Sequence, residues 1–142
     1  GRVGHSGDLP ELVGEADVAV MTAPLTKETA HLFDKAMFDR MKRGAIFVNV
    51  SRGGIVQQDD LVAALKSGQV GAAGLDVTDP EPLPPGHPLW SAPNILLTPH
   101  VAGDNSGTRG SREGGWRLAT ENLRRYVAGE RLYNHSAIER GY

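Results

Sequence analysis

The fold is decided by residues 41–84, which read MKRGAIFVNVSRGGIVQQDDLVAALKSGQVGAAGLDVTDPEPLP. An apolar run at Ala45–Val50 is followed by Leu61 and Leu65, which share one face of a helix, and then by a second apolar run at Gly71–Leu75. A strand, a helix and a strand in this order form a βαβ unit, whose two strands lie parallel. The segment therefore predicts an α/β protein built on a parallel sheet.

The same alternation extends outward on both sides of this segment. It predicts a parallel sheet of about four strands flanked by helices. The strands are expected at Asp17–Met21, Ala45–Asn49, Gly71–Val77 and Asn94–Leu97. The helices are expected at Leu9–Glu15 with Asp8 as the N-cap, at Asp34–Lys42 ended by Gly44, around Leu61, Val62 and Leu65 ended by Gly68, and from Trp116 to Val127 ended by Gly129.

Two segments do not fit regular structure. Asp79–Pro88 holds five prolines, and because proline fixes φ and lacks a backbone donor, we expect a rigid loop across the mouth of the sheet. Gly107–Gly115 carries more glycine than the start of a helix usually tolerates. We expect one domain over residues 1–130 and a tail over residues 131–142. Trp90 and Trp116 are expected to pack in the core or at an interface.

The composition excludes several classes of protein. Of 142 residues, 39% are hydrophobic and 23% are charged, and the formal net charge is −2. Without a basic stripe, neither nucleic acid nor a lipid surface is an expected partner. The absence of cysteine excludes disulfides, thiolate metal sites and thiol nucleophiles. No apolar run approaches the roughly 20 residues that cross a bilayer, and we expect a cytoplasmic protein.

Asp59 and Asp60 resemble a pair of metal ligands. They lie where a helix should begin, and no histidine or further carboxylate is close to them in sequence. Acidic residues at that position favour the positive end of the helix dipole. We therefore predict no metal site.

Residues able to bind a carbonyl compound follow three of the predicted strands. In a parallel α/β sheet, ligands bind outside the carboxyl ends of the strands. Arg52 offers a planar fork that matches a carboxylate, and His100 can donate or accept a proton near neutral pH. Either residue alone is more often structural or solvated, but Glu81 near the imidazole would orient it and favour its protonated form. Together they indicate a site that holds an anionic carbonyl substrate and moves a proton.

Residues 41–84 resemble the long signature of the D-isomer-specific 2-hydroxyacid dehydrogenases. APLTKETAHLF at residues 23–33 and HPLWSAPNILLTPHVAG at residues 87–103 continue the resemblance. It covers nearly the whole chain and weakens only in about the last ten residues. The resemblance implies the second half of a Rossmann-type doubly wound domain, without the G-x-G-x-x-G turn, the acidic ribose reader and the separate substrate domain that such proteins carry.

The resemblance also implies roles for individual residues. Arg52 would bind the carboxylate and carbonyl oxygen of a 2-oxo acid, while Glu81 and His100 would form the proton-transferring pair. Asp76, which by itself reads as a cap or turn residue, would contact the nicotinamide side of the cofactor. Further cofactor contacts are implied at Ala23, Pro24 and Thr29 beside the adenosine half, at Val50 beside the carboxamide, and at Gly103.

The implied activity is hydride transfer between NAD(H) and a pair of a 2-oxo acid and a D-2-hydroxy acid. NADP is not excluded, because the ribose-reading loop is not in the sequence, and the particular acid is left open. Two alternatives remain: an NAD(H)-responsive corepressor-like binding module, which would keep Arg52, Glu81 and His100, and a catalytically inert truncation. The resemblance further implies a homodimer paired through its cofactor domains.

Overall fold

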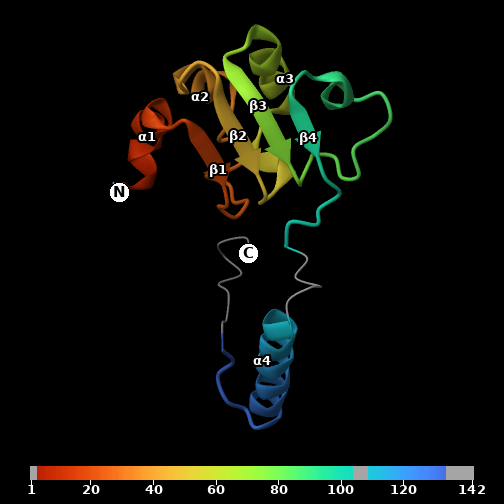
Figure 1. The fold of residues 1–142 in the computed structure, drawn as a ribbon. Coiled ribbons are helices and arrows are strands. Elements are labelled where there is room, and N and C mark those ends of the chain that lie inside the picture. The colour runs from red at the N-terminus through yellow and green to blue at the C-terminus, as the bar shows by residue number, and fades with distance from the viewer. Residues whose placement is uncertain (1–2, 104–108, 134–142) are drawn as a thin grey trace. The chain divides into compact units, whose positions relative to one another are not determined.

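The computed structural model describes residues 3–103 and 109–133, and the chain divides into two compact units, residues 1–102 and 103–142. The first unit contains a four-stranded sheet in the order β1-β2-β3-β4, with every neighbouring pair parallel (Figure 1). Its strands are β1 (Val18–Met21), β2 (Ala45–Asn49), β3 (Val70–Leu75) and β4 (Ile95–Leu97). The predicted parallel α/β sheet is confirmed. Because all strands run in the same direction, their four carboxyl ends lie along one side of the sheet, called the carboxyl edge below.

Helices connect the strands on one side of the sheet. They are α1 (Leu9–Glu15), α2 (Lys35–Arg40) and α3 (Gln58–Ser67), with short 3-10 helices η1 (Ser6–Asp8), η2 (Gly53–Ile55) and η3 (Pro88–Ser91). α1 packs against α2, α2 packs against α3, and α3 also contacts β3. Along β2 buried and more exposed residues alternate, so the helices cover a single face.

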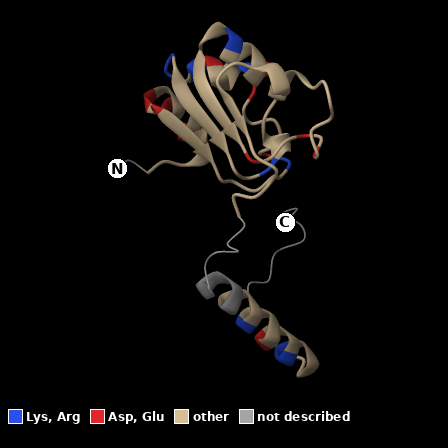
Figure 2. Ribbon diagram, turned by 45° about the vertical axis from the view of Figure 1, so that its right-hand side comes forward, with Lys and Arg blue, Asp and Glu red and all other residues tan. Residues whose placement is uncertain are grey.

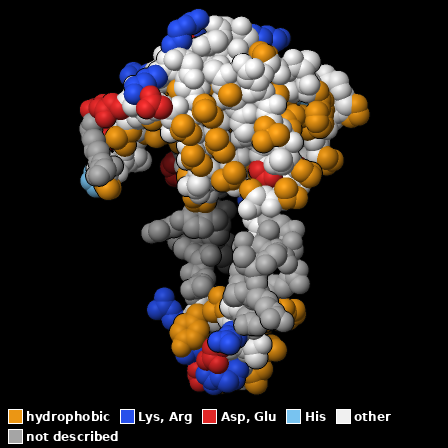
Figure 3. All heavy atoms as spheres, in the orientation of Figure 1, with side chains coloured by type: hydrophobic (Ala, Val, Ile, Leu, Met, Phe, Trp, Pro, Cys, Tyr) orange, Lys and Arg blue, Asp and Glu red, His pale blue; other side chains and the backbone are white. Residues whose placement is uncertain are grey.

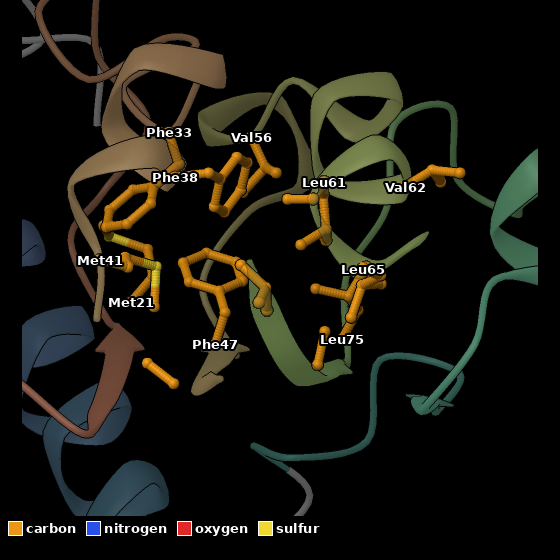
Figure 4. Packing of buried hydrophobic residues seen from close by; sticks show 14 of the residues in the cluster. Met21, Phe33, Phe38, Met41, Phe47, Val56, Leu61, Val62, Leu65 and Leu75 are labelled. Atoms are coloured by element: carbon orange, nitrogen blue, oxygen red, sulfur yellow. The ribbon is translucent and has the colours of Figure 1, made fainter. Parts of the chain in front are cut away.

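Three aromatic rings form the centre of the core (Figure 4). The ring centroids of Phe33 and Phe47 lie 4.7 Å apart, those of Phe38 and Phe47 5.4 Å apart, and those of Phe33 and Phe38 5.8 Å apart. All three side chains are buried, and such pairs contribute about 0.5–1.5 kcal/mol each beyond their buried area. The core thus fixes β2 against the segment that enters α2.

Most predicted boundaries hold within a few residues, and the differences have local causes. α2 ends at Arg40, because Met41 adopts extended backbone (φ −62°, ψ 151°). The side chain of Asp34 accepts a hydrogen bond from Met37 N at 2.9 Å and caps α2. Asp8, the predicted cap of α1, makes no such bond; its Oδ2 accepts instead from His5 N. Gly68 adopts the left-handed conformation (φ +71°) that ends α3.

The two tryptophans do not lie in the core. Trp90 is 57% exposed and Trp116 is 73% exposed. The indole Nε1 of Trp90 donates to Pro84 O at 2.9 Å and so fastens η3 to the proline-rich loop. η3 itself was not predicted. Core packing of the tryptophans was therefore a wrong prediction, and interface packing stays a prediction.

The face of the sheet opposite the helices of the first unit carries exposed apolar side chains. The register pairs Val18 with Ile46, and it pairs Leu96 with Gly74, which in turn pairs with Val48, two residues after Ile46. Because alternate residues of a strand point to the same face, the side chains of Val18, Ile46 and Leu96 share one face. Val18 is 50% exposed, Ile46 42% and Leu96 66%. Figure 3 shows hydrophobic side chains gathered over the sheet on this face.

The second unit is built on α4 (Arg109–Val127). The helix includes part of segment 107–115, which has more glycine than a helix start usually tolerates. Each glycine costs only about 1 kcal/mol and does not forbid a helix; positions 107 and 108 lie outside the described residues. Basic and acidic residues both occur along α4 (Figure 2), where Arg124 and Arg125 both pair with Glu121. Gly129 (φ +69°) follows the helix end as predicted. Of the helices in the described ranges, none is long and apolar enough to cross a membrane.

Candidate active site

His100 and Glu81 meet at the carboxyl edge of the sheet. His100 lies just beyond β4, and Glu81 lies in the loop that follows β3. The imidazole Nδ1 and the carboxylate Oε1 are 2.6 Å apart. Because a carboxylate only accepts hydrogen bonds, Nδ1 is the donor, which leaves Nε2 facing away from Glu81. Both side chains are about two-fifths exposed, at 43% and 40%, so the pair is reachable by a ligand.

Asp76 holds the segment on both sides of His100 through the Thr98 side chain before it and two backbone N–H groups after it. Its Oδ1 accepts hydrogen bonds from Thr98 Oγ1 at 2.5 Å and Val101 N at 2.8 Å, and its Oδ2 accepts from Ala102 N at 2.8 Å. Burial alone would raise the pKa of the Asp76 carboxyl, but the hydrogen bonds from Thr98, Ala102 and Val101 outweigh it and lower that pKa below its ordinary value. The carboxylate therefore fixes the turn in which His100 adopts a left-handed backbone conformation (φ +57°).

Arg52 lies in the turn after β2. A pocket lies beside His100, and Arg52 does not line it. The Nη1 of Arg52 donates to the neighbouring Ser51 O at 2.7 Å. Asn49, fully buried at the end of β2, donates from Nδ2 to Arg52 O at 2.9 Å and accepts from Ser51 N at 3.0 Å. The turn that carries Arg52 is thus fixed from inside. The structure brings Glu81 and His100 into contact, and it places Arg52 at the same edge of the sheet without joining it to them.

A pocket of about 410 Å³ opens beside the pair. Glu81, His100 and Asp76 contribute its polar groups, while Trp90 and Leu97 are among its apolar walls. Its volume lies in the range of sites that hold small organic ligands. A titratable pair at the mouth of an apolar pocket is suited to proton transfer on a bound molecule.

The residues expected on the cofactor side lie at the ends of β1 and β2. Ala23 O accepts a hydrogen bond from Ser51 Oγ, and Thr29 Oγ1 donates to Pro24 O at 2.7 Å, so these side chains also shape the loop. Val50 is 39% exposed. Pro24 and Val50 are exposed, and Ala23 and Thr29 are half-buried. Gly103 is exposed at the end of the described segment.

Sequence reasoning missed Asn49 and Gln58 as contributors to this edge. Asn49 could have been noticed as an amide within an apolar strand. Gln58 stands beside Gln57, and nothing in the sequence distinguishes the two. Within the described ranges, no three histidine, aspartate or glutamate side chains gather as metal ligands.

Residues 2–102 match the NAD-binding domain of the D-isomer specific 2-hydroxyacid dehydrogenases. The chain belongs to this family. The match covers the whole sheet and all three candidate catalytic residues.

Curated relatives include reductases of small oxo acids. The chain is 44% identical over 124 residues to a glyoxylate reductase/hydroxypyruvate reductase from Mus musculus, covering 87% of the chain and 37% of the relative. It is 48% identical over 102 residues to a glyoxylate/hydroxypyruvate reductase B from Citrobacter koseri, covering 72% and 32%. The chain therefore spans about a third of the length of these relatives.

Solved structures of the family share the fold. A D-isomer specific 2-hydroxyacid dehydrogenase from Xanthobacter autotrophicus in complex with NADPH and MES superposes with a TM-score of 0.84 at 39% identity, covering 96% of this chain and 55% of that one. An NADPH-dependent glyoxylate/hydroxypyruvate reductase from Sinorhizobium meliloti in complex with NADP and sulfate gives 0.83 at 30% identity, covering 96% and 43%. The Rossmann-like dehydrogenase fold expected from the sequence is confirmed.

Proposed function

We propose that this chain is the part of a 2-hydroxyacid dehydrogenase that carries the proton-transferring and substrate-binding residues. The reaction is the reduction of a 2-oxo acid to a D-2-hydroxy acid with NADH or NADPH, and its reverse. The observation that carries the proposal is the 2.6 Å contact between His100 and Glu81 at the carboxyl edge of the sheet, beside an apolar pocket.

His100 is the proton donor in this proposal. Glu81 engages Nδ1, so the protonated imidazole presents its Nε2–H to the carbonyl oxygen of the substrate. The contact of its Nδ1 with the Glu81 carboxylate fixes the orientation of the ring. As the carbonyl is reduced, the Nε2 proton passes to the developing alkoxide, and oxidation returns it to His100.

Arg52 binds the substrate carboxylate. Its side chain is exposed at the end of β2, and one guanidinium nitrogen is used by Ser51 O, which leaves other N–H groups for a ligand. A guanidinium pairs with a carboxylate through two parallel hydrogen bonds and so orients the neighbouring carbonyl. Asn49 holds the turn in place while the side chain binds.

The residues at the ends of β1 and β2 fit a nicotinamide cofactor. Ala23, Pro24 and Val50 offer an accessible, partly apolar surface, and Thr29 shapes the loop that bears Pro24. When bound, the cofactor supplies the hydride that the carbonyl carbon receives. Asp76 lies close to that region, but the bonds described above direct its oxygens to the His100 turn.

The test is turnover by the complete enzyme that contains this chain, with NADH and NADPH and with glyoxylate, hydroxypyruvate and pyruvate as substrates. His100→Gln should lower kcat by at least about 100-fold, because general acid catalysis contributes roughly 10²–10⁴-fold. Arg52→Ala should also raise KM, because the bidentate contact is lost.

The matched control is His5→Gln, at an exposed histidine far along the chain from the pair. It should leave both kcat and KM unchanged. Small and equal effects of His100→Gln and Arg52→Ala, or turnover of none of these acids, would refute the proposal.

A further inference from the structure

Gln58 forms two hydrogen bonds with the backbone of one residue, Asp79, in the loop that carries Glu81. It lies at the start of α3 and is only 8% exposed. Its amide Nε2 donates to Asp79 O, and its Oε1 accepts from Asp79 N at 3.1 Å. A glutamine side chain offers one donor group and one acceptor in this geometry, so it pairs with the backbone of Asp79 as a neighbouring strand would.

A second contact joins the same two segments. A Cβ atom added to Gly53 would lie 2.0 Å from Thr78 C and 2.1 Å from Thr78 O. The turn after Arg52 and the segment before Glu81 therefore pack backbone against backbone, which a side chain at position 53 would prevent. Gln58 and Gly53 fasten the loop at Thr78 and Asp79, immediately upstream of Glu81.

Glu81 has far less support of its own. Its side chain is 40% exposed, and its hydrogen bond goes to His100. The carboxylate can meet the imidazole at 2.6 Å only if the loop leaves Asp79 in the right direction. We propose that Gln58 is a positioning residue, which sets the place of Glu81 and thereby the orientation and protonated nitrogen of His100. The importance of this role for turnover rests on the proposed function, whereas the geometric role does not.

Two variants separate positioning from simple filling of space. Gln58→Met keeps the length of the side chain and removes both hydrogen bonds to Asp79. Gln58→Glu keeps the acceptor but lacks the donor and places a carboxylate oxygen against Asp79 O. Gln57→Met and Gln57→Glu are matched controls, because Gln57 is the exposed neighbour and its side chain does not cap α3.

The readout is the tautomer of His100, measured by ¹⁵N-detected NMR on the 142-residue chain at a pH where the imidazole is neutral. In the unaltered chain the hydrogen should reside on Nδ1, where Glu81 accepts it. Both Gln58 variants should lose this state and shift the ring toward the Nε2–H form, and Glu81→Ala should produce the same shift. Both Gln57 controls should keep it. Thermal unfolding shows whether each variant remains folded.

Each possible result either supports or overturns the positioning role of Gln58. A folded Gln58→Met or Gln58→Glu chain with the unaltered His100 tautomer would overturn the proposal. If Gln58→Met fails to fold, Gln58→Glu decides, and if both fail, Gln58 serves the fold as a whole and the specific role is refuted. The NMR signal needs no turnover. If the Gln58 variants show the expected tautomer shift but the unaltered complete enzyme turns over none of the 2-oxo acids, the result counts against the proposed function alone.

Discussion

Buried polar side chains hold the backbone around the candidate site. In the described part of the first unit, these are Asn49, Ser51, Gln58 and Asp76. Asn49 bonds to the Arg52 turn, Gln58 to the loop before Glu81, and Asp76 to the turn around His100. A buried polar group without a partner costs about 1–3 kcal/mol, so these residues are tolerated only because each one meets a backbone group that also needs a partner.

Asp76 provides a pH-dependent test of this arrangement. Its pKa is lowered in the folded chain, so its contribution to stability is fully present above the ordinary aspartate pKa of about 3.9 and is lost as the pH falls through the lower folded value. Asp76→Asn should reduce the free energy of unfolding by roughly 1.5–3 kcal/mol at neutral pH, because charge-assisted hydrogen bonds are lost. The difference between the two chains should shrink below about pH 4.

Urea unfolding at a series of pH values measures this difference. Asp59→Asn is the control, since Asp59 is an exposed carboxylate at the start of α3. A stability difference for Asp76→Asn that stays constant from neutral pH down to the acid limit would contradict the assignment.

Candidate catalytic residues are easier to name from the sequence than the residues that position them. Arg52, Glu81 and His100 could be named because strand ends and a long family signature mark them. Gln58 could not be separated from Gln57, because its role depends on the approach of Asp79, 21 positions along the chain. The contact between Glu81 and His100, 19 positions apart, required the resemblance, since spacing alone does not bring them together.

At the scale of elements, local signals placed the helices and strands, and tertiary packing set their ends. Ala45–Asn49 and Leu9–Glu15 have the bounds that the sequence predicted. β3 begins at Val70 and ends at Leu75, whereas the predicted strand extends to Val77. It ends there because β4 pairs with it only as far as Leu97, beyond which the chain enters the site loops.

The N-cap of α2 gives a prediction at this scale. Asp34→Ala should lower the free energy of unfolding by about 1 kcal/mol, because Met37 N loses its acceptor. Asp8→Ala is the matched control: Asp8 also precedes a helix, but its side chain makes no cap bond to α1. Thermal or urea unfolding compares the two. Asp8→Ala removes only the bond from His5 N, so an equal loss from both variants would contradict the cap role of Asp34.

At the scale of the whole molecule, the first unit has one covered and one open face. The helices bury the side of the sheet that bears Phe47, while Val18, Ile46 and Leu96 remain exposed on the other. β1 also lies at one end of the strand order, so its outer backbone groups pair with no strand in the described ranges. An apolar face beside an open edge strand favours association, because burying it removes apolar surface from water.

We therefore expect the 142-residue chain to self-associate, or to be stabilised by a partner that covers this face. Sedimentation velocity should show a weight-average mass that rises with protein concentration. Val20→Lys, at a residue 56% exposed on the open face, should weaken the association because a buried ammonium group is costly. Ala63→Lys adds the same charge at an exposed position of α3 and should leave it unchanged. If the unaltered chain remains a monomer at all concentrations and unfolds cooperatively when dilute, the open face is stable in water and the expectation is wrong.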